Sequence, residues 1–192
     1  MTSKTPHMNF ENQFLIAMPQ LKDSFFAGTV TYMWKHSADG ALGIVINKPL
    51  AASVSDIFDE LNIVCDTEAE YFAEQKVLAG GPVERDKGFI LHNSSKLWDS
   101  SVSISSEISL CTSRTILEDI ANGNGPDKYV IALGCAGWDA GQLEREIAEN
   151  SWLTAPAKSD LLFSNNYNTM ASTAAAQLGI TLNQISPEAG HS

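Results

Sequence analysis

The chain has 192 residues, 44% of them hydrophobic and 18% charged, so it is long enough to bury a substantial core as one globular domain. Twelve Lys and Arg against 23 Asp and Glu give a formal net charge of −11, which repels phosphate backbones and argues against direct nucleic-acid binding. The longest run without charged or strongly polar side chains, Tyr129 to Trp138, is about half of the roughly 20 residues that a membrane-spanning helix needs, so we expect no membrane association.

Cysteine usage indicates reduced structural thiols. Cys65, Cys111 and Cys135 are widely spaced and form no Cys-x-x-Cys motif. Only His36 and His92 fall within the part of the chain expected to be ordered, which is too few for a zinc site. The N-terminus shows no secretory signal. We therefore expect a cytoplasmic protein with no metal and no cofactor.

The first third of the chain predicts short strands followed by a helix. A buried strand is expected at Phe14–Ala17, closed by a proline. Thr29–Trp34 and Gly43–Ile46 have strand patterns, and the intervening Ala38-Asp39-Gly40 is typical of a hairpin turn. A helix capped by its first residue is expected from Ser53 to about Leu61, with apolar residues on one face.

In the middle of the chain, one acidic segment is followed by several predicted short strands. Asp66–Glu74 carries four acidic residues and is interpreted as a solvated helix or loop. Val77–Ala79 predicts a strand that enters a tight turn at Gly80-Gly81-Pro82. Three further short strands are expected at Gly88–His92, Val102–Ile104 and Ile108–Cys111. Their close spacing favours antiparallel pairing.

The last third predicts three helices. Ser113 caps a helix that ends at Asn122-Gly123. The apolar strand Tyr129–Leu133 is expected to turn at Gly134–Trp138 into a helix that Asp139 caps, with Gln142 reaching back. The remaining expectations are a strand at Trp152–Thr154 and a helix at Asn168–Leu178.

No repeat and no Gly/Ser or Pro linker divides the sequence, so residues 1–192 are expected to form a single domain. The polar segment Met1–Met8 and the segment from Ile185 onward are expected to be loose ends around an ordered part from about 9 to 184.

No catalytic motif is complete. The spacing of the glycines in Gly134–Gly141 differs from the dinucleotide fingerprint, and no Lys-Ser or Lys-Thr pair makes a P-loop. Cys135 lacks the glycine two positions earlier that a nucleophile elbow requires. One enzymatic alternative remains, an acid/base site built from His92, Ser113 and Arg114.

Several turns have the composition of a shallow polar pocket, and Arg114 among them can bind a carboxylate or phosphate with two nitrogens. We expect the turns at 80–82, 113–114 and 137–138 to lie on one face. The candidates for ligand or partner binding are Asn47, Pro49, Gly80, Gly81, Pro82, His92, Ser113, Arg114, Gly137, Trp138 and Gln142.

Eight strings along most of the chain occur in the order found in a bacterial family. They are Phe14–Pro19, Asp39–Pro49, Gly80–Val83, Gly88–His92, Gly123–Pro126, Gly134–Trp138, Gly141–Glu144 and Asn150–Leu153. On these strings the chain resembles the AlgH/YqgE family.

Three positions depart from the family pattern. Lys35-His36-Ser37 stands where Glu-His-Asn is common, Ser113-Arg114-Thr115 where Ser-Arg-Asp is common, and Cys135 where the family has an aromatic residue. These departures argue against a carboxylate role at position 115 and against Cys135 as a nucleophile.

The resemblance implies an α+β fold with a branched, mostly antiparallel sheet, part of it curled into a small barrel, and helices around it. The family label is that of a transcriptional regulator, inherited from alginate control. The acidic charge and the lack of catalytic groups then favour a non-enzymatic protein that regulates indirectly, by binding a protein partner or a small polar ligand.

Overall fold

The computed structural model describes residues 8–66 and 68–184. The two expected loose ends lie outside this part of the chain, apart from Met8. The strands are β1 (Gln13–Ala17), β2 (Val30–Ser37), β3 (Gly40–Val45), β4 (Pro49–Ser53), β5 (Lys76–Ala79), β6 (Val83–His92), β7 (Ser101–Ser103), β8 (Ser109–Cys111), β9 (Tyr129–Asp139) and β10 (Trp152–Pro156). The helices are α1 (Val54–Glu60), α2 (Ala69–Glu74), α3 (Arg114–Ala121), α4 (Gln142–Ala148), α5 (Ser159–Leu162) and α6 (Met170–Ala176), followed by the 3-10 turn η1 (Leu182–Gln184).

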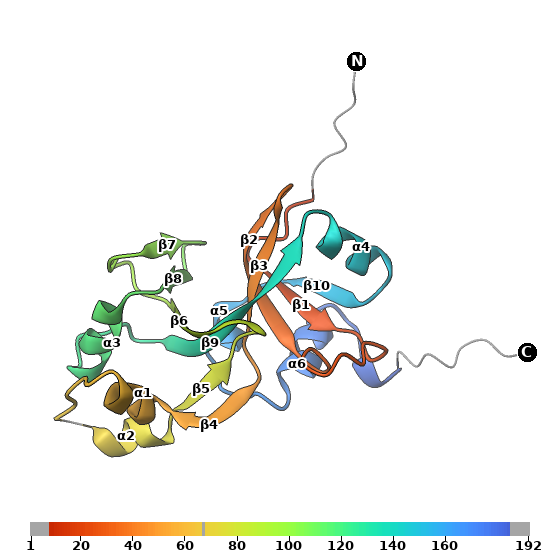
Figure 1. The fold of residues 1–192 in the computed structure, drawn as a ribbon. Coiled ribbons are helices and arrows are strands. Elements are labelled where there is room, and N and C mark those ends of the chain that lie inside the picture. The colour runs from red at the N-terminus through yellow and green to blue at the C-terminus, as the bar shows by residue number, and fades with distance from the viewer. Residues whose placement is uncertain (1–7, 67, 185–192) are drawn as a thin grey trace, which may run out of the picture.

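The long strand β9 belongs to both parts of a branched sheet (Figure 1). Its first part, residues 129–135, pairs with β6, and its last part, residues 136–139, pairs with β3. One arm of the sheet is therefore β10-β1-β2-β3, and the other contains β4 to β8. Among the described strands, every pairing is antiparallel except that of β5 with β9. This curled, branched sheet with surrounding helices confirms the expected α+β fold.

β9 continues through the segment that was expected to be a turn. Gly134 has a φ of +82°, which a glycine adopts without strain, so the chain bends there instead of ending the strand. Ala136–Asp139 then pair with β3, and this pairing keeps the segment extended. The predicted strand-to-helix turn at Gly134–Trp138 is therefore wrong. Gly141, not Asp139, precedes α4, although the Gln142 side chain does accept a hydrogen bond of 3.0 Å from the Asp139 backbone N–H.

Three predictions from local sequence, a helix cap, a hairpin turn and a glycine at a helix end, are confirmed by the structure. Ser53 and Asp56 form a reciprocal capping box at the start of α1. The turn before Gly40 joins β2 and β3 in the expected hairpin. Gly123, with a φ of +78°, follows the end of α3 as a C-terminal glycine should.

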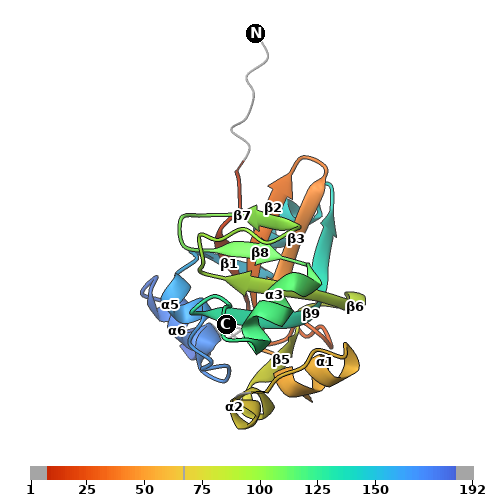
Figure 2. The ribbon, with the colours of Figure 1, turned by 90° about the vertical axis from the view of Figure 1, so that its left-hand side faces the viewer.

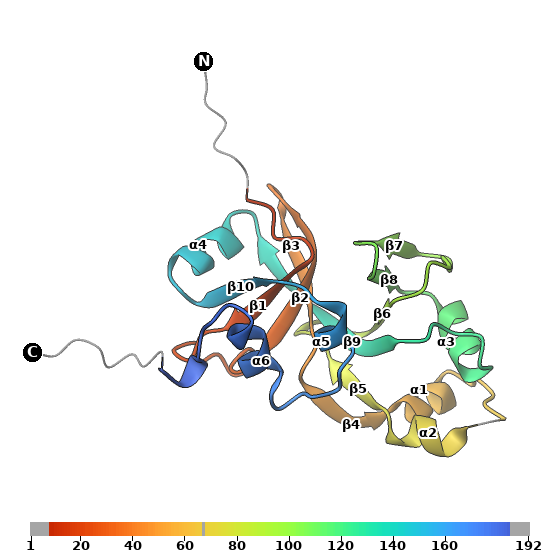
Figure 3. The same ribbon diagram turned by 180° about the vertical axis from the view of Figure 1, so that it is seen from behind.

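The helices lie in groups around the sheet. Seen from the side, α3 lies in front of β9, with β7 and β8 above it and α1 and α2 below (Figure 2). From behind, α5 and α6 lie against the β1–β10 side of the molecule (Figure 3). The buried side chains form three clusters, and the one beneath α4 contains two tryptophans, Trp138 and Trp152.

Candidate functional site

The candidate turn at 80–82 lies where the two arms meet. The Ala79 backbone N–H donates to the Lys48 carbonyl at 2.8 Å, and the Gly80 N–H donates to the Leu133 carbonyl at 2.8 Å. A Cβ on Gly81 would overlap the backbone of Cys135. The two glycines are therefore explained by the close crossing of two backbones, whereas Pro82 is exposed beside them.

Asn47 and Pro49 lie on the other side of the same junction. The Asn47 side-chain oxygen accepts a hydrogen bond of 2.8 Å from the Val30 N–H, and its amide nitrogen donates to the Gly28 carbonyl at 3.0 Å. Pro49 is exposed at the start of β4, opposite Leu78. Asn47 thus ties the end of β3 to the start of β2, and its polar atoms are occupied by backbone partners.

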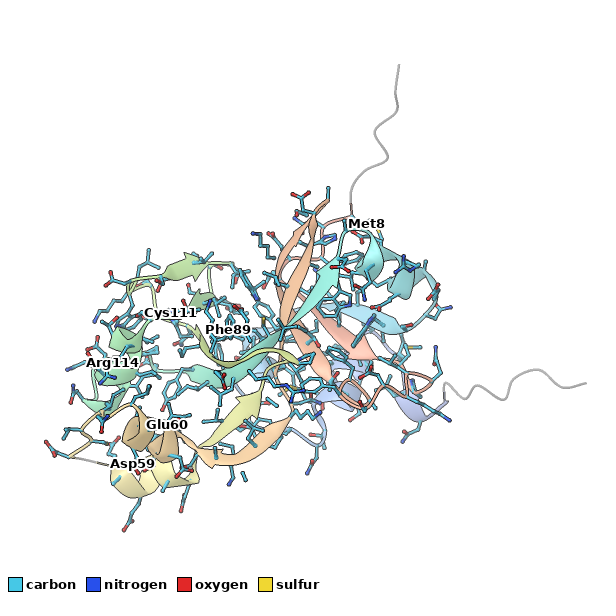
Figure 4. All side chains as sticks on the ribbon, viewed as in Figure 1. Met8, Asp59, Glu60, Phe89, Cys111 and Arg114 are labelled. Carbon is cyan, nitrogen blue, oxygen red and sulfur yellow. The ribbon has the colours of Figure 1, made fainter. Side chains whose placement is uncertain are left out.

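Ser113 and Arg114 lie at the start of α3, at the outer end of the β4–β8 arm, as the position of Arg114 in Figure 4 shows. The Arg114 Nε donates to Glu118 one helical turn away at 2.7 Å, and the Ser113 hydroxyl contacts the Thr115 hydroxyl at 2.6 Å. Gly137 and Trp138 belong to the other arm. The expectation that all three turns share one face is therefore not met.

His92 is fully buried at the end of β6. Its Nδ1 accepts a hydrogen bond of 3.2 Å from the Ser94 N–H, and its ring packs edge-on against Trp98 at 5.2 Å. Burial lowers the pKa of His92 below its usual value. The structure gives no hydrogen bond from His92 to Ser113 or Arg114 among the described residues, so it does not assemble the enzymatic alternative.

Trp138 and Gln142 contact a carboxylate that the sequence did not single out. Glu146 accepts hydrogen bonds from the indole nitrogens of Trp138 at 2.8 Å and Trp152 at 3.0 Å, and from the Gln142 amide at 3.1 Å. Both indoles are buried, so each N–H needs this acceptor. The hydrogen bonds of Trp138 and Trp152 therefore hold α4 against the sheet, while Gln142 supports Glu146 from within the same helix. Gly137 is exposed next to Trp138.

Cys135 is buried and lies within 3.9 Å of the Glu84 carboxylate. Burial and the negative charge of Glu84 raise the pKa of the Cys135 thiol, against a smaller opposing effect of Lys87. The thiolate form is disfavoured, which is the reverse of what an activated nucleophile requires.

A different set of residues lines a hollow next to α2. It has a volume of about 290 Å³ and is lined by, among others, Tyr71, Glu74, Gln75, Tyr129, Asn165 and Tyr167. These residues come from α2, the start of β5, the start of β9 and the segment between α5 and α6. We call this hollow the tyrosine cleft, because three of the four tyrosines of the chain line it.

Two of these tyrosines are positioned by hydrogen bonds. The Tyr129 hydroxyl donates to the Gln75 side-chain oxygen at 2.6 Å, and the Tyr167 hydroxyl donates to the Asn165 side-chain oxygen at 3.2 Å. Burial raises the pKa of both phenols above the usual value. Both therefore stay protonated and can offer an oxygen lone pair or a ring face to a ligand at neutral pH.

Tyr71 differs from the other two because it is 53% exposed. Its ring packs edge-on against Phe72 at 5.4 Å, and Phe72 in turn packs against Phe58 of α1 at 5.1 Å. The Tyr71 ring is thus anchored on one side by the core beneath α1 and α2. The rest of the ring is left to solvent or to a ligand.

The part of the chain that the structure describes offers no group of three or more His, Cys, Asp or Glu side chains that could hold a metal ion. Within the same residues, no helix combines the length and the apolar character needed to cross a bilayer.

Sequence analysis missed the tyrosine cleft. Tyr71, Tyr129 and Tyr167 are far apart in the chain, and none of them lies in a recognisable motif. Gln75 ends a helix and gives no signal of its own. The only hint was compositional, since tyrosine is a frequent binding residue, and the tertiary fold was needed to bring the three together.

The fold and the cleft define an α+β protein with a branched, half-barrel sheet and a polar aromatic cleft beside it. The chain belongs to the AlgH-like family, because the family model described as DUF179, AlgH-like, matches residues 14–183. This result confirms the resemblance found in the sequence.

Similar proteins cover nearly the whole chain. The UPF0301 protein Tgr7_2910 of Thioalkalivibrio sulfidiphilus is 47% identical over 187 residues, which cover 97% of this chain and 99% of the relative. A UPF0301 protein of Shewanella oneidensis is 44% identical over 184 residues, covering 95% and 98%.

Two solved structures share the fold. The solution structure of AlgH from Pseudomonas aeruginosa has a TM-score of 0.79 and 40% identity, and the match covers 100% of both chains. The crystal structure of DIP2367 from Corynebacterium diphtheriae has a TM-score of 0.73 at 17% identity, covering 94% of this chain and 93% of that one. The second likeness concerns the fold alone.

Proposed function

We propose that this protein acts without catalysing a reaction, by binding a small polar ligand in the tyrosine cleft. The observation that carries the proposal is the convergence of Tyr71, Tyr129 and Tyr167 from three separate regions of the chain on one hollow. Pockets that combine aromatic surface with a few oriented polar groups are typical of small-molecule sites.

The hydrogen bonds within the cleft support a binding role. Gln75 and Asn165 hold the Tyr129 and Tyr167 hydroxyls in place before any ligand arrives. Such preorganisation reduces the entropy that a ligand must lose on binding. The cleft also joins α2 and β5 to the segment between α5 and α6, so a bound ligand contacts elements that are far apart in the sequence.

Catalysis has less support. A general base must reach the substrate, yet His92 is fully buried, and the Cys135 pKa is raised. The candidate residues Ser113 and Arg114 are engaged by Thr115 and Glu118 within or beside α3.

We further propose that transcriptional regulation by this protein is indirect, through a protein partner whose binding depends on ligand in the cleft. The net charge of −11 supports this view over direct DNA contact. A cytoplasmic location is part of the same proposal. Cys111 and Cys135 form no disulfide in the structure, which suits a reducing compartment.

The proposal is tested by NMR titration of the labelled protein with a panel of neutral, anionic and cationic metabolites. At least one member should shift resonances of Tyr71, Tyr129 and Tyr167 together, and Tyr167→Ala should weaken that binding. Tyr32→Phe is the matched control, because Tyr32 is the one tyrosine outside the cleft and lies in the core. Shifts that map elsewhere, or no shifts with any ligand class at millimolar concentration, would overturn the proposal.

A further inference from the structure

We propose that the ligand of the tyrosine cleft is a small organic cation, an amine with one or more primary ammonium groups. This inference rests on the proposed binding function and adds the chemical class of the ligand. It follows from the charges around the cleft and the hollows that adjoin it, and from the aromatic surface inside it.

The charges at the cleft are strongly unequal. A second hollow of about 190 Å³ shares Tyr71 and Tyr129 with the cleft, and a third, open hollow also shares Tyr71. The carboxylates that line the three hollows are Glu68, Glu70, Glu74 and Asp127. Among the described lining residues, Lys76 is the only Lys or Arg. A ligand entering here meets a negative potential that attracts cations and repels anions.

The charge of Glu68 acts on Tyr129 as well. Burial is the largest cause of the raised pKa of Tyr129, and the Glu68 carboxylate adds to it, so Glu68 disfavours a negative charge on the Tyr129 oxygen. An anionic ligand at the same place meets the same repulsion from Glu68, whereas an ammonium group is attracted by it.

The aromatic surface supplies the second element of amine recognition. Tyrosine ring faces attract cations, and a tyrosine hydroxyl oxygen accepts hydrogen bonds from an ammonium group. Tyr71 presents an exposed ring, and Tyr129 has its proton directed to Gln75, so the Tyr129 oxygen lone pairs remain available as acceptors. Rings and carboxylates together form the combination that binds amines in water.

The lysine at the cleft, Lys76, lies opposite Ser53 in the β4–β5 pairing. Hydrogen bonds from Ser53 hold the pKa of Asp56 below its usual value, and the Lys76 charge adds a smaller effect. A phosphate or carboxylate ligand would need more than this one exposed lysine.

The test compares ligands of one length that differ in charge: 1,4-diaminobutane, 1,4-butanediol and succinate. Isothermal titration and NMR should show the diamine binding in the cleft at least about tenfold more tightly than the diol or the dianion, and losing affinity as salt rises. Glu74→Gln keeps the size of the side chain and should weaken diamine binding about fivefold, the scale of one partly solvated charge contact. Glu149→Gln, an exposed site at the end of α4, is the matched control and should leave it unchanged.

The outcomes separate this inference from the proposed function. Equal or tighter binding of succinate or butanediol in the cleft would overturn the cation assignment and leave the binding function standing. Diamine binding that Glu74→Gln does not weaken, or that maps outside the cleft, would also overturn the assignment. Failure of all three probes would overturn the assignment too, and the wider metabolite panel would then decide the binding function separately.

Discussion

The backbone of Gly81 crosses that of Cys135 so closely that a Cβ atom on the glycine would overlap the Cys135 carbonyl group. Both sides of this contact are main chain, so no side chain can rotate away to make room. We therefore expect Gly81→Ala to destabilise the protein by about 3 kcal/mol or more in urea denaturation, at the upper end of overpacking costs. Gly88→Ala is the control, since a Cβ on Gly88 meets nothing within 4 Å, and it should stay within about 0.5 kcal/mol of the parent. Equal stability of the two variants would refute the crossing.

Glu146 is the shared acceptor for the Trp138 and Trp152 indoles. Glu146→Ala leaves both buried N–H groups without this partner and should cost about 2 to 3 kcal/mol of unfolding free energy. Glu149→Ala, at the exposed residue that follows the same helix, is the control and should cost less than about 0.5 kcal/mol. Tryptophan fluorescence during denaturation measures both variants, and matching midpoints would show that the carboxylate does not support the indoles.

Because of His92, we expect the unfolding free energy of the protein to change at mildly acidic pH. Because burial lowers its pKa in the folded state, the unfolded chain binds the proton more readily below the ordinary pKa of 6.5. Its contribution to stability is therefore complete above pH 6.5 and is lost as the pH falls from there toward the folded-state pKa. His92→Gln should flatten the slope of unfolding free energy against pH in this window, whatever its effect on stability at pH 8. An unchanged slope would mean that His92 is protonated equally in both states.

The three thiols should differ in reactivity. Cys65 is partly exposed, whereas Cys111 and Cys135 are buried and the pKa of Cys135 is raised. We expect iodoacetamide to alkylate Cys65 first in the native protein, with the other two reacting only after unfolding. Peptide mass spectrometry over a time course measures the order. Early modification of Cys135 would contradict the structure and revive the nucleophile hypothesis.

Much of the fold could be predicted from local sequence, because interactions between residues close together in the chain determine it. The capping box at Ser53 and Asp56, the hairpin before Gly40 and the glycine after α3 are each determined within a few residues. The mostly antiparallel pairing of the sheet was predicted from the short, closely spaced strands. Long-range pairing was needed to extend β9 past Gly134, and a local rule for glycine-rich turns therefore gave the wrong result there.

The site was less predictable for the same reason. The turns around Gly81 and Asn47 looked like a polar pocket because glycine, proline and asparagine are shared by binding loops and by tight structural crossings. In the structure these residues satisfy backbone contacts. The tyrosines of the cleft carry no local signature, so only the tertiary fold identifies them.

The sharing of β9 by both arms has a consequence for the way the protein opens. Removing β9 from its neighbours breaks ladders in both sheets at once, so neither half retains a complete set of strand partners when the other melts. Amide protons on β1 and on β8 should therefore exchange with solvent at similar slow rates, as parts of one cooperative unit. If the two arms of the sheet unfold only together, a structural change in one arm can alter the other arm without a hinge between them.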